Sequence, residues 1–142
     1  APGISQIYYG DETARPLSIN GAEGDANLRS NMNWSDIATK NSTKELLVHW
    51  QKLGKFRKNH PAVGAGIHKM ISSSPYWFSR VYGNDKVIVG LDLPQGSKEI
   101  HVNGIFSEGQ KIRDAYSGAT MKVIGGKISL ESAFPVVLLE AF

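Results

Sequence analysis

The sequence predicts an α+β fold in which a strand–loop–helix segment precedes an antiparallel β-sandwich. Three observations carry this prediction. A short apolar run ends at Gly10, one amphipathic helix begins near Ser42, and the chain after Gly66 alternates between short apolar segments and turns. We therefore predict two parts, residues 1–66 and residues 67–142.

The first segment, Ile4 to Tyr9, is rich in β-forming apolar residues and is predicted to be a short buried strand. Gly10-Asp11-Glu12 then breaks it into an acidic turn. Residues 13–41 show little periodicity and are rich in Gly and Asn, so they are predicted to form a long loop. Loops of this length in compact domains are usually functional or disordered, and the ordered ending at Trp34 favours a functional one.

The clearest helix is predicted to begin at Ser42-Thr43-Lys44-Glu45, which has the pattern of a capping box. Pro61 is expected to end it, because proline lacks the amide that a helix interior needs. Its apolar residues follow at helical spacing and form one stripe: Leu46, Leu47, Trp50 and Leu53.

The remainder of the chain predicts seven or eight short strands in a Greek-key-like antiparallel sandwich. Gly83-Asn84-Asp85, Ser117-Gly118 and Gly125-Gly126 are typical turn sequences, and the last suits a tight hairpin. Val87, Val89, Leu91 and Leu93 are expected to line one face of a strand. The other strands are expected at 67–72, 76–82, 99–102, 111–116, 120–124, 127–130 and 135–140.

Composition excludes several classes of function. The 142 residues contain no cysteine, so they offer neither a disulfide framework nor a thiolate site, and the compartment stays open. No apolar run approaches the ~20 residues of a membrane span. Ala1-Pro2-Gly3 does not resemble a signal peptide, and a targeting signal of a longer parent would lie upstream.

The net charge of +3 is mild. The densest basic stretch, Lys52 to Lys58, is expected to form a solvated helix face, so we predict no nucleic-acid partner. The four histidines, at positions 49, 60, 68 and 101, show no metal-ligand spacing, and no phosphate-binding glycine loop is present. We predict neither a metal nor another cofactor.

Two motifs resemble the α-amylase family of glycoside hydrolases. Tyr8-Tyr9-Gly10-Asp11-Glu12 is similar to that family's "YYGDE" run, and the segment from Asp25 through Arg29 and Met32 to Trp34 is similar to its "D-x-x-x-R-x-x-M-x-W" element. The resemblance implies the last strand, loop and helix of a (β/α)8 barrel followed by a C-terminal β domain. A complete barrel needs ~250 residues, so most of it would be missing.

Further along, Arg113 to Gly118 is similar to a "D-x-x-[ST]-G" turn of these C-terminal domains. The related oligosaccharide hydrolases often have Arg-Thr-Pro-Met-Gln-Trp, whereas this chain has Arg29-Ser30-Asn31-Met32-Asn33-Trp34. The missing proline leaves the loop less constrained in φ.

A retaining glycosidase needs two carboxyl groups about 5 Å apart, one as nucleophile and one as acid/base. In the family, these two acids and a third substrate-binding Asp come from earlier strands, and none of their motifs occurs in this chain. We therefore assign no catalytic residue and expect the isolated chain to be inactive. Asp11 and Glu12 are poor substitutes, since neighbouring strand residues point to opposite faces. With Tyr9 they are expected to be structural at the barrel mouth.

Asp25 and Arg29 are the predicted substrate-binding residues. The resemblance implies that they contact glucose hydroxyls, and a carboxylate and a guanidinium are suited to accept and to donate those hydrogen bonds. The alternative is an i, i+4 ion pair that only braces the loop.

The expected function is that of the C-terminal part of an enzyme that hydrolyses starch or maltooligosaccharides. Its partners would be an α-glucan and either the missing barrel portion or a second copy. The alternatives are a non-catalytic carbohydrate-binding module and an interaction sandwich unrelated to sugars.

Overall fold

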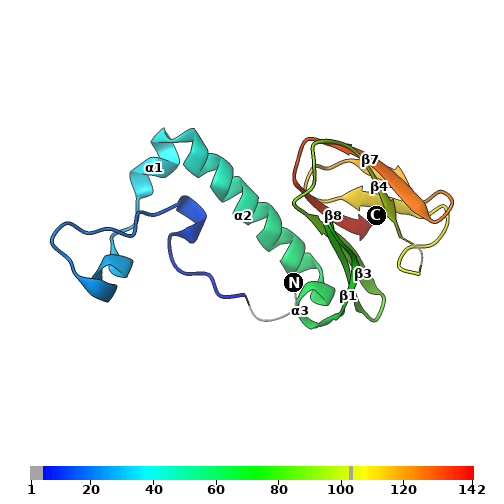
Figure 1. Ribbon diagram of the computed structural model, residues 1–142, viewed down its shortest axis with the longest axis horizontal. Coiled ribbons are helices and arrows are strands. Elements are labelled where there is room, and N and C mark those ends of the chain that lie inside the picture. The colour runs from blue at the N-terminus through cyan, green and yellow to red at the C-terminus, as the bar shows by residue number, and fades with distance from the viewer. Residues whose placement is uncertain (1–4, 103) are drawn as a thin grey trace. The chain divides into compact units, whose positions relative to one another are not determined.

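The computed structural model describes residues 5–102 and 104–142 (Figure 1). Residues 1–4, which include Ile4 of the expected first strand and Ala1-Pro2-Gly3, lie outside the described residues, as does residue 103. The chain divides into two compact units, whose described residues run from 5 to 53 and from 54 to 142.

The helices lie in the first half of the chain. They are the 3₁₀ helices η1 (Asp11–Thr13) and η2 (Gly24–Arg29) and the α-helices α1 (Trp34–Thr39), α2 (Asn41–Asn59) and α3 (Pro61–Ala65). The predicted capping box at Ser42 is wrong, because α2 already begins at Asn41. Only Lys40 separates it from α1, and the carbonyl of Lys40 accepts the amide of Lys44 at 3.2 Å. Pro61 follows the end of α2 as expected and also opens α3, where its missing amide costs nothing.

Within the described residues, eight strands follow α3, as the alternation of apolar segments and turns predicts. They are β1 (Ile67–Ser73), β2 (Tyr76–Tyr82), β3 (Asp85–Leu91), β4 (Gly96–His101), β5 (Lys111–Asp114), β6 (Thr120–Lys122), β7 (Lys127–Ser132) and β8 (Val136–Ala141). Six form an antiparallel sheet in the order β1-β2-β3-β8-β5-β6, and β4 pairs with β7 in a second sheet. The protein is therefore a mixed α and β structure with antiparallel sheets, as predicted.

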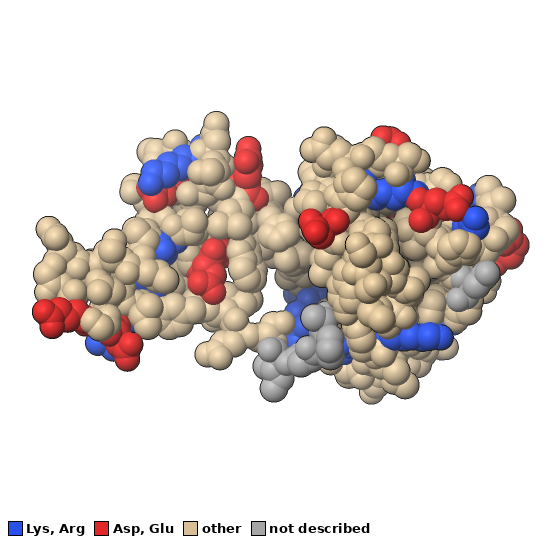
Figure 2. Space-filling view, in the orientation of Figure 1, with Lys and Arg blue, Asp and Glu red and all other residues tan. Residues whose placement is uncertain are grey.

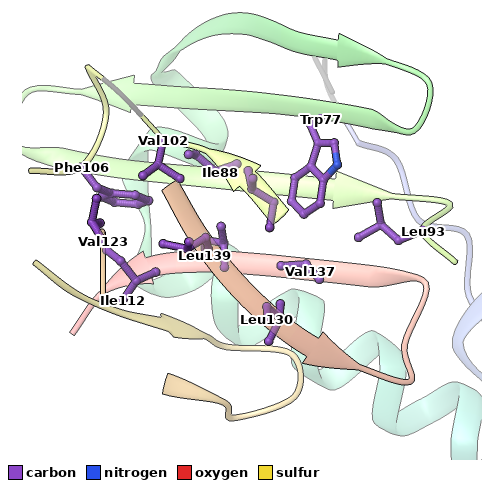
Figure 3. Close-up of a cluster of buried hydrophobic side chains, with 12 residues drawn as sticks. Trp77, Ile88, Leu93, Val102, Phe106, Ile112, Val123, Leu130, Val137 and Leu139 are labelled. Atoms are coloured by element: carbon purple, nitrogen blue, oxygen red, sulfur yellow. The ribbon is translucent and has the colours of Figure 1, made fainter. Parts of the chain in front are cut away.

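The apolar core lies between the two sheets, as Figure 3 shows. Trp77 and Ile88 come from the larger sheet, while Ile100 and Leu130 come from β4 and β7. Ile88, Ile112, Ile128 and Leu139 are almost fully buried. Burial of such side chains is worth about 1.5–3 kcal/mol each, so this unit has a substantial core of its own.

The expected single apolar face over 87–93 is only partly correct. Val87 and Val89 are buried, but the core between the sheets takes Ile88 from the same strand and Leu93 from beyond its end. Asp92 has a φ of 56° and interrupts the strand alternation. The central strands are buried on both faces because α3 packs against β2 and β3 in addition to the core.

The strand expected over 4–9 is wrong for its described residues. Residues 5–9 form no strand, and Ile7 is 57% exposed. A strand needs a neighbour for its backbone amides and carbonyls. In the described part of the chain, every paired strand lies at residue 67 or beyond. The apolar pattern is present here, but no strand among the described residues pairs with it.

None of the helices within the described ranges is both long and apolar enough to cross a membrane. Figure 2 shows acidic and basic side chains beside one another on the visible face of the molecule. Two ion pairs lie at or near the surface, Lys40 with Asp36 at 3.0 Å and Lys127 with Glu99 at 2.8 Å.

Candidate carbohydrate-binding loop

The unit formed by residues 5–53 has a polar interior. Among its described residues, the fully buried ones are Gly10, Thr13, Arg15, Ser30 and Thr43. Many of its large apolar side chains are instead exposed: Ile7, Tyr8, Tyr9, Leu17, Ile19, Leu28, Trp34 and Val48. Others are half-buried: Met32, Ile37, Leu46, Leu47, Trp50 and Leu53. The most deeply buried side chains of this unit are therefore polar and are held by hydrogen bonds.

The turn after Tyr9 depends on Gly10, which has a φ of 91°. A Cβ at this position would come within 2.5 Å of the Arg15 side chain, so glycine is required by space as well as by conformation. The two acids of the turn bind local backbone amides. Asp11 Oδ2 accepts from the amide of Tyr8 at 3.0 Å, and Glu12 Oε2 accepts from that of Gly10 at 3.1 Å.

Asp25 and Arg29 lie at the start and end of η2, and both are exposed. No ion pair joins these two described residues. Asn27, between them, ties the helix to the preceding loop. Its Oδ1 accepts from the amide of Ile19 at 2.9 Å, and its Nδ2 donates to the carbonyl of Ala22 at 3.3 Å. The structure thus presents a carboxylate and a guanidinium to solvent on one braced turn.

Sequence reasoning missed the central residue of this unit, Arg15. Its guanidinium donates to the backbone carbonyls of Tyr9, Leu28 and Ser30, each at 3.0 Å. It also donates to Ser30 Oγ. Arginine is almost never fully buried in proteins unless it is paired, and nothing in the sequence separates this one from the exposed cations.

Asn33 joins the acidic turn to the start of α1. Its Nδ2 donates to the carbonyl of Thr13 at 2.9 Å and to Asp36 Oδ2 at 2.8 Å, and its Oδ1 accepts from the Thr13 hydroxyl at 2.8 Å. The Asn33 amide, followed by the Lys40 ammonium, lowers the pKa of Asp36. Asp36 therefore supports this connection in its ionised form.

Replacing Asn33 with alanine should raise the pKa of Asp36 toward its ordinary value, because the first cause of the shift is removed. A depressed folded pKa means that the stabilisation is present above the unfolded pKa and is lost as the pH falls through the folded pKa. An NMR titration of the Asp36 carboxyl carbon measures this directly. Lys40→Ala is the matched control and should give a smaller rise; equal values in Asn33→Ala and the unmodified chain would contradict the assignment.

The unit formed by residues 54–142 contains a second polar cluster. His60, between α2 and α3, contacts Asp85 Oδ1 through Nδ1 at 2.7 Å and Glu140 Oε2 through Nε2 at 2.5 Å. Arg113 donates to Glu140 Oε1, and the amide of Ala62 donates to Asp85 Oδ2. A pocket of about 280 Å³ lies beside His60 and Asp85. The carboxylates are already paired, so we assign this cluster to stability.

Across residues 5–102 and 104–142, no group of three or more His, Asp or Glu side chains is arranged to hold a metal ion.

The turn after β5 is also assigned to stability. Asp114 is fully buried, and its carboxylate accepts from the amides of Tyr116, Ser117 and Leu138 and from the Ser117 hydroxyl.

Comparisons with known proteins find similarity to α-amylases. The periplasmic α-amylase of Escherichia coli (strain K12) is 43% identical over 90 residues, which are 63% of this chain and 13% of that protein. No family profile matches the chain.

Solved structures show the same fold. The α-amylase of Anoxybacillus matches 100% of this chain with a TM-score of 0.68 and 24% identity, over 30% of its own length. AmyP in complex with maltose matches 81% of this chain with a TM-score of 0.61 and 20% identity, over 24% of its own length. The chain is thus similar to an α-amylase over part of its length, and the match spans only about an eighth of that curated relative.

Proposed function

We propose that the chain is the C-terminal part of a retaining α-glycoside hydrolase that acts on starch or maltooligosaccharides. In this proposal residues 1–66 are the last strand, loop and helix of a (β/α)8 barrel. Residues 67–142 are the C-terminal β-sandwich, with Greek-key-like connections. The curated relative is an α-amylase, and one structural relative was solved with maltose, which supports an α-glucan as the ligand of the whole enzyme.

The observation that carries this proposal is the polar interior of residues 5–53. A barrel segment buries its apolar side chains against other strands and helices of the barrel, so by itself it exposes them. Ile7, with 57% of its surface exposed, and Leu17, with 53%, fit that expectation. A loop region that evolved as an independent module would be expected to bury such residues in a core of its own.

Asp25 and Arg29 are the proposed sugar-binding residues. Both are exposed, and no ion pair between them occupies the carboxylate or the guanidinium. A carboxylate accepts hydrogen bonds from vicinal hydroxyls, and a guanidinium donates several in a fixed fork. Tyr9, Asp11 and Glu12 have the proposed structural role at the barrel mouth, since both acids bind amides of their own turn.

The catalytic acids are proposed to come from upstream sequence. Hydrolysis with retention needs a nucleophile and an acid/base about 5 Å apart around the scissile bond. Asp11 and Glu12, the adjacent acids of the turn, are each engaged with a backbone amide. The isolated chain is therefore expected to leave starch and maltooligosaccharides unchanged.

A chimera tests the proposal. The matching segment of the E. coli periplasmic α-amylase is replaced by this chain, and release of reducing sugar from maltooligosaccharides is measured. We expect an active chimera, and an Arg29→Ala or Asp25→Ala substitution in it should raise KM about tenfold or more, as expected for the loss of a charged hydrogen bond. Unchanged kinetics in both variants would assign the two residues to bracing only.

Affinity electrophoresis in a glucan gel separates the enzyme segment from a binding module. A segment that needs the barrel to complete its site should show little retardation when the isolated chain is run. Clear retardation of the isolated chain, together with an inactive chimera, would overturn the proposal in favour of a non-catalytic carbohydrate-binding module.

A further inference from the structure

We propose that Arg15 is the positioning residue of the sugar-binding loop and that it sets the orientation of Arg29. The inference rests on the proposed function, because it assigns a cause to the geometry of a proposed sugar contact. It concerns a residue that neither the motif similarity nor the exposed polar groups single out.

The geometry around Arg29 is the first support. Arg15 Nη2 donates to the carbonyl of Leu28 and Nη1 donates to that of Ser30, both at 3.0 Å. These two carbonyls flank Arg29 in the sequence. The Leu28 carbonyl belongs to the peptide group just before Arg29, and the Ser30 carbonyl belongs to the peptide group just after Ser30. Holding these two groups restrains the backbone on both sides of the Arg29–Ser30 pair and so restricts the direction of the Arg29 Cα–Cβ bond. The buried guanidinium of Arg15 therefore restrains the backbone from which the exposed Arg29 side chain extends.

The same side chain joins the loop to the turn before it. Arg15 Nε donates to the carbonyl of Tyr9 at 3.0 Å, and the guanidinium carbon lies 4.0 Å from the centre of the Tyr9 ring. The Tyr9 hydroxyl in turn donates to the carbonyl of Ser30 at 3.2 Å. Arg15 thus connects the proposed barrel-mouth segment to the end of η2.

The chemistry of this contact is specific for arginine. The side chain is 6% exposed, and no carboxylate among the described residues forms an ion pair with it. Its charge is solvated by carbonyl dipoles and an aromatic face, an arrangement suited to a planar fork of five donors. A lysine would keep the charge but could not reach carbonyls on three separate residues with the same geometry.

The packing around Arg15 leaves it little freedom. Any Cβ at Gly10 would come within 2.5–2.7 Å of three atoms of its side chain. The Ser30 hydroxyl, which accepts from Arg15, also donates to the carbonyl of Pro16 at 2.5 Å. Contacts on several sides therefore restrict the position of the Arg15 guanidinium. A side chain restricted in this way can restrain the backbone groups to which it donates.

Hydrogen–deuterium exchange on the full chain tests the positioning directly. In Arg15→Lys and Arg15→Ala, the amides of residues 17–33 should exchange about tenfold or more faster, because charged hydrogen bonds that restrain this loop are lost. The amides of β2, β3 and β8 should be unchanged. Arg57→Ala, which removes an exposed arginine from α2, is the matched control and should leave the loop unaffected. Loop exchange equal to that of the unmodified chain would overturn the proposal.

Kinetics in the chimera supply a readout that a purely structural role would not give. Arg15→Lys should raise KM for maltooligosaccharides about tenfold while kcat changes by less than about threefold, because the reacting carboxylates lie elsewhere. Millimolar guanidinium should lower the KM of Arg15→Ala and leave that of Arg15→Lys unchanged. Equal losses in kcat and stability with no change in KM would contradict positioning.

The two proposals fail in different ways. If Arg29→Ala and Asp25→Ala leave KM unchanged while the Arg15 variants still loosen the loop, the sugar contact is wrong and the restraint by Arg15 stands. If the Arg29 variant raises KM but the Arg15 variants change neither exchange nor KM, the positioning role is wrong and the sugar contact stands.

Discussion

Asp114→Asn should lower the free energy of unfolding of the β unit by about 2–4 kcal/mol, since hydrogen bonds to a charged group are worth about 1.5–3 kcal/mol each. The carboxylate is fully buried and accepts on both oxygens. Oδ1 binds the amides of Tyr116 and Leu138 at 3.1 and 2.8 Å, and Oδ2 binds the amide and the hydroxyl of Ser117 at 3.1 and 2.5 Å. In either of its two orientations, an asparagine amide would place its NH₂ group against N–H or O–H donors, and two donors cannot form a hydrogen bond with each other.

Urea unfolding followed by circular dichroism measures this loss. Glu131→Gln is the matched control, because Glu131 is an exposed acid on β7 and its substitution should change stability by less than about 0.5 kcal/mol. Ser117→Ala should cost about 1 kcal/mol, as expected for one lost hydrogen bond. An Asp114→Asn variant as stable as the Glu131 control would show that the four contacts contribute nothing net.

The second large effect is expected for His60→Ala, which should lower the free energy of unfolding by about 2–4 kcal/mol, since both contacts of the ring with carboxyl groups are lost together. The Glu140 side chain is only 6% exposed, so water cannot readily replace the ring. The ring also lies 4.6 Å from that of Phe56, which is buried at the end of α2. His60 therefore fastens the junction between α2 and α3 to β3 and β8.

The matched control for this prediction is His101→Ala. His101 is exposed at the end of β4, and its removal should change stability by less than about 0.5 kcal/mol. Both variants are compared by the same urea titration. A loss below about 1 kcal/mol in His60→Ala would mean that Arg113 and the Ala62 amide satisfy the two carboxylates without the ring.

Much of the fold of the β unit could be predicted from local signals. Val87, Ile88 and Val89 form a β-branched run, and Gly125 and Gly126 both adopt the positive φ expected of a tight turn, at 59° and 71°. Such preferences act between near neighbours, so they survive in any arrangement of the sheet. Sequence could not indicate that β8 lies between β3 and β5, because that order depends on contacts between distant residues.

The candidate site also contains residues that local sequence could indicate and residues whose role depends on distant contacts. Asp25 and Arg29 could be named from the spacing of a motif, and the structure places both on η2. The environment of Arg15 could not be predicted, since Leu28 and Ser30 lie 13 and 15 residues from it in the sequence. Likewise, an apolar run over 4–9 predicts a strand, yet residues 5–9 are unpaired because a strand forms only beside a neighbour.

The sequence by itself therefore determined the class of fold, the resemblance to α-amylases, and the approximate positions of the strands found in the described residues, since each depends on local patterning or on short motifs. Only the tertiary structure decided which polar side chains are buried and what they hold. Arg15, His60 and Asp114 look like ordinary surface residues in the sequence, and their roles arise from carbonyls, carboxylates and amides that folding brings to them. Burial removes these groups from water, so each must find its hydrogen-bond partners within the protein. This requirement determines which residues they contact.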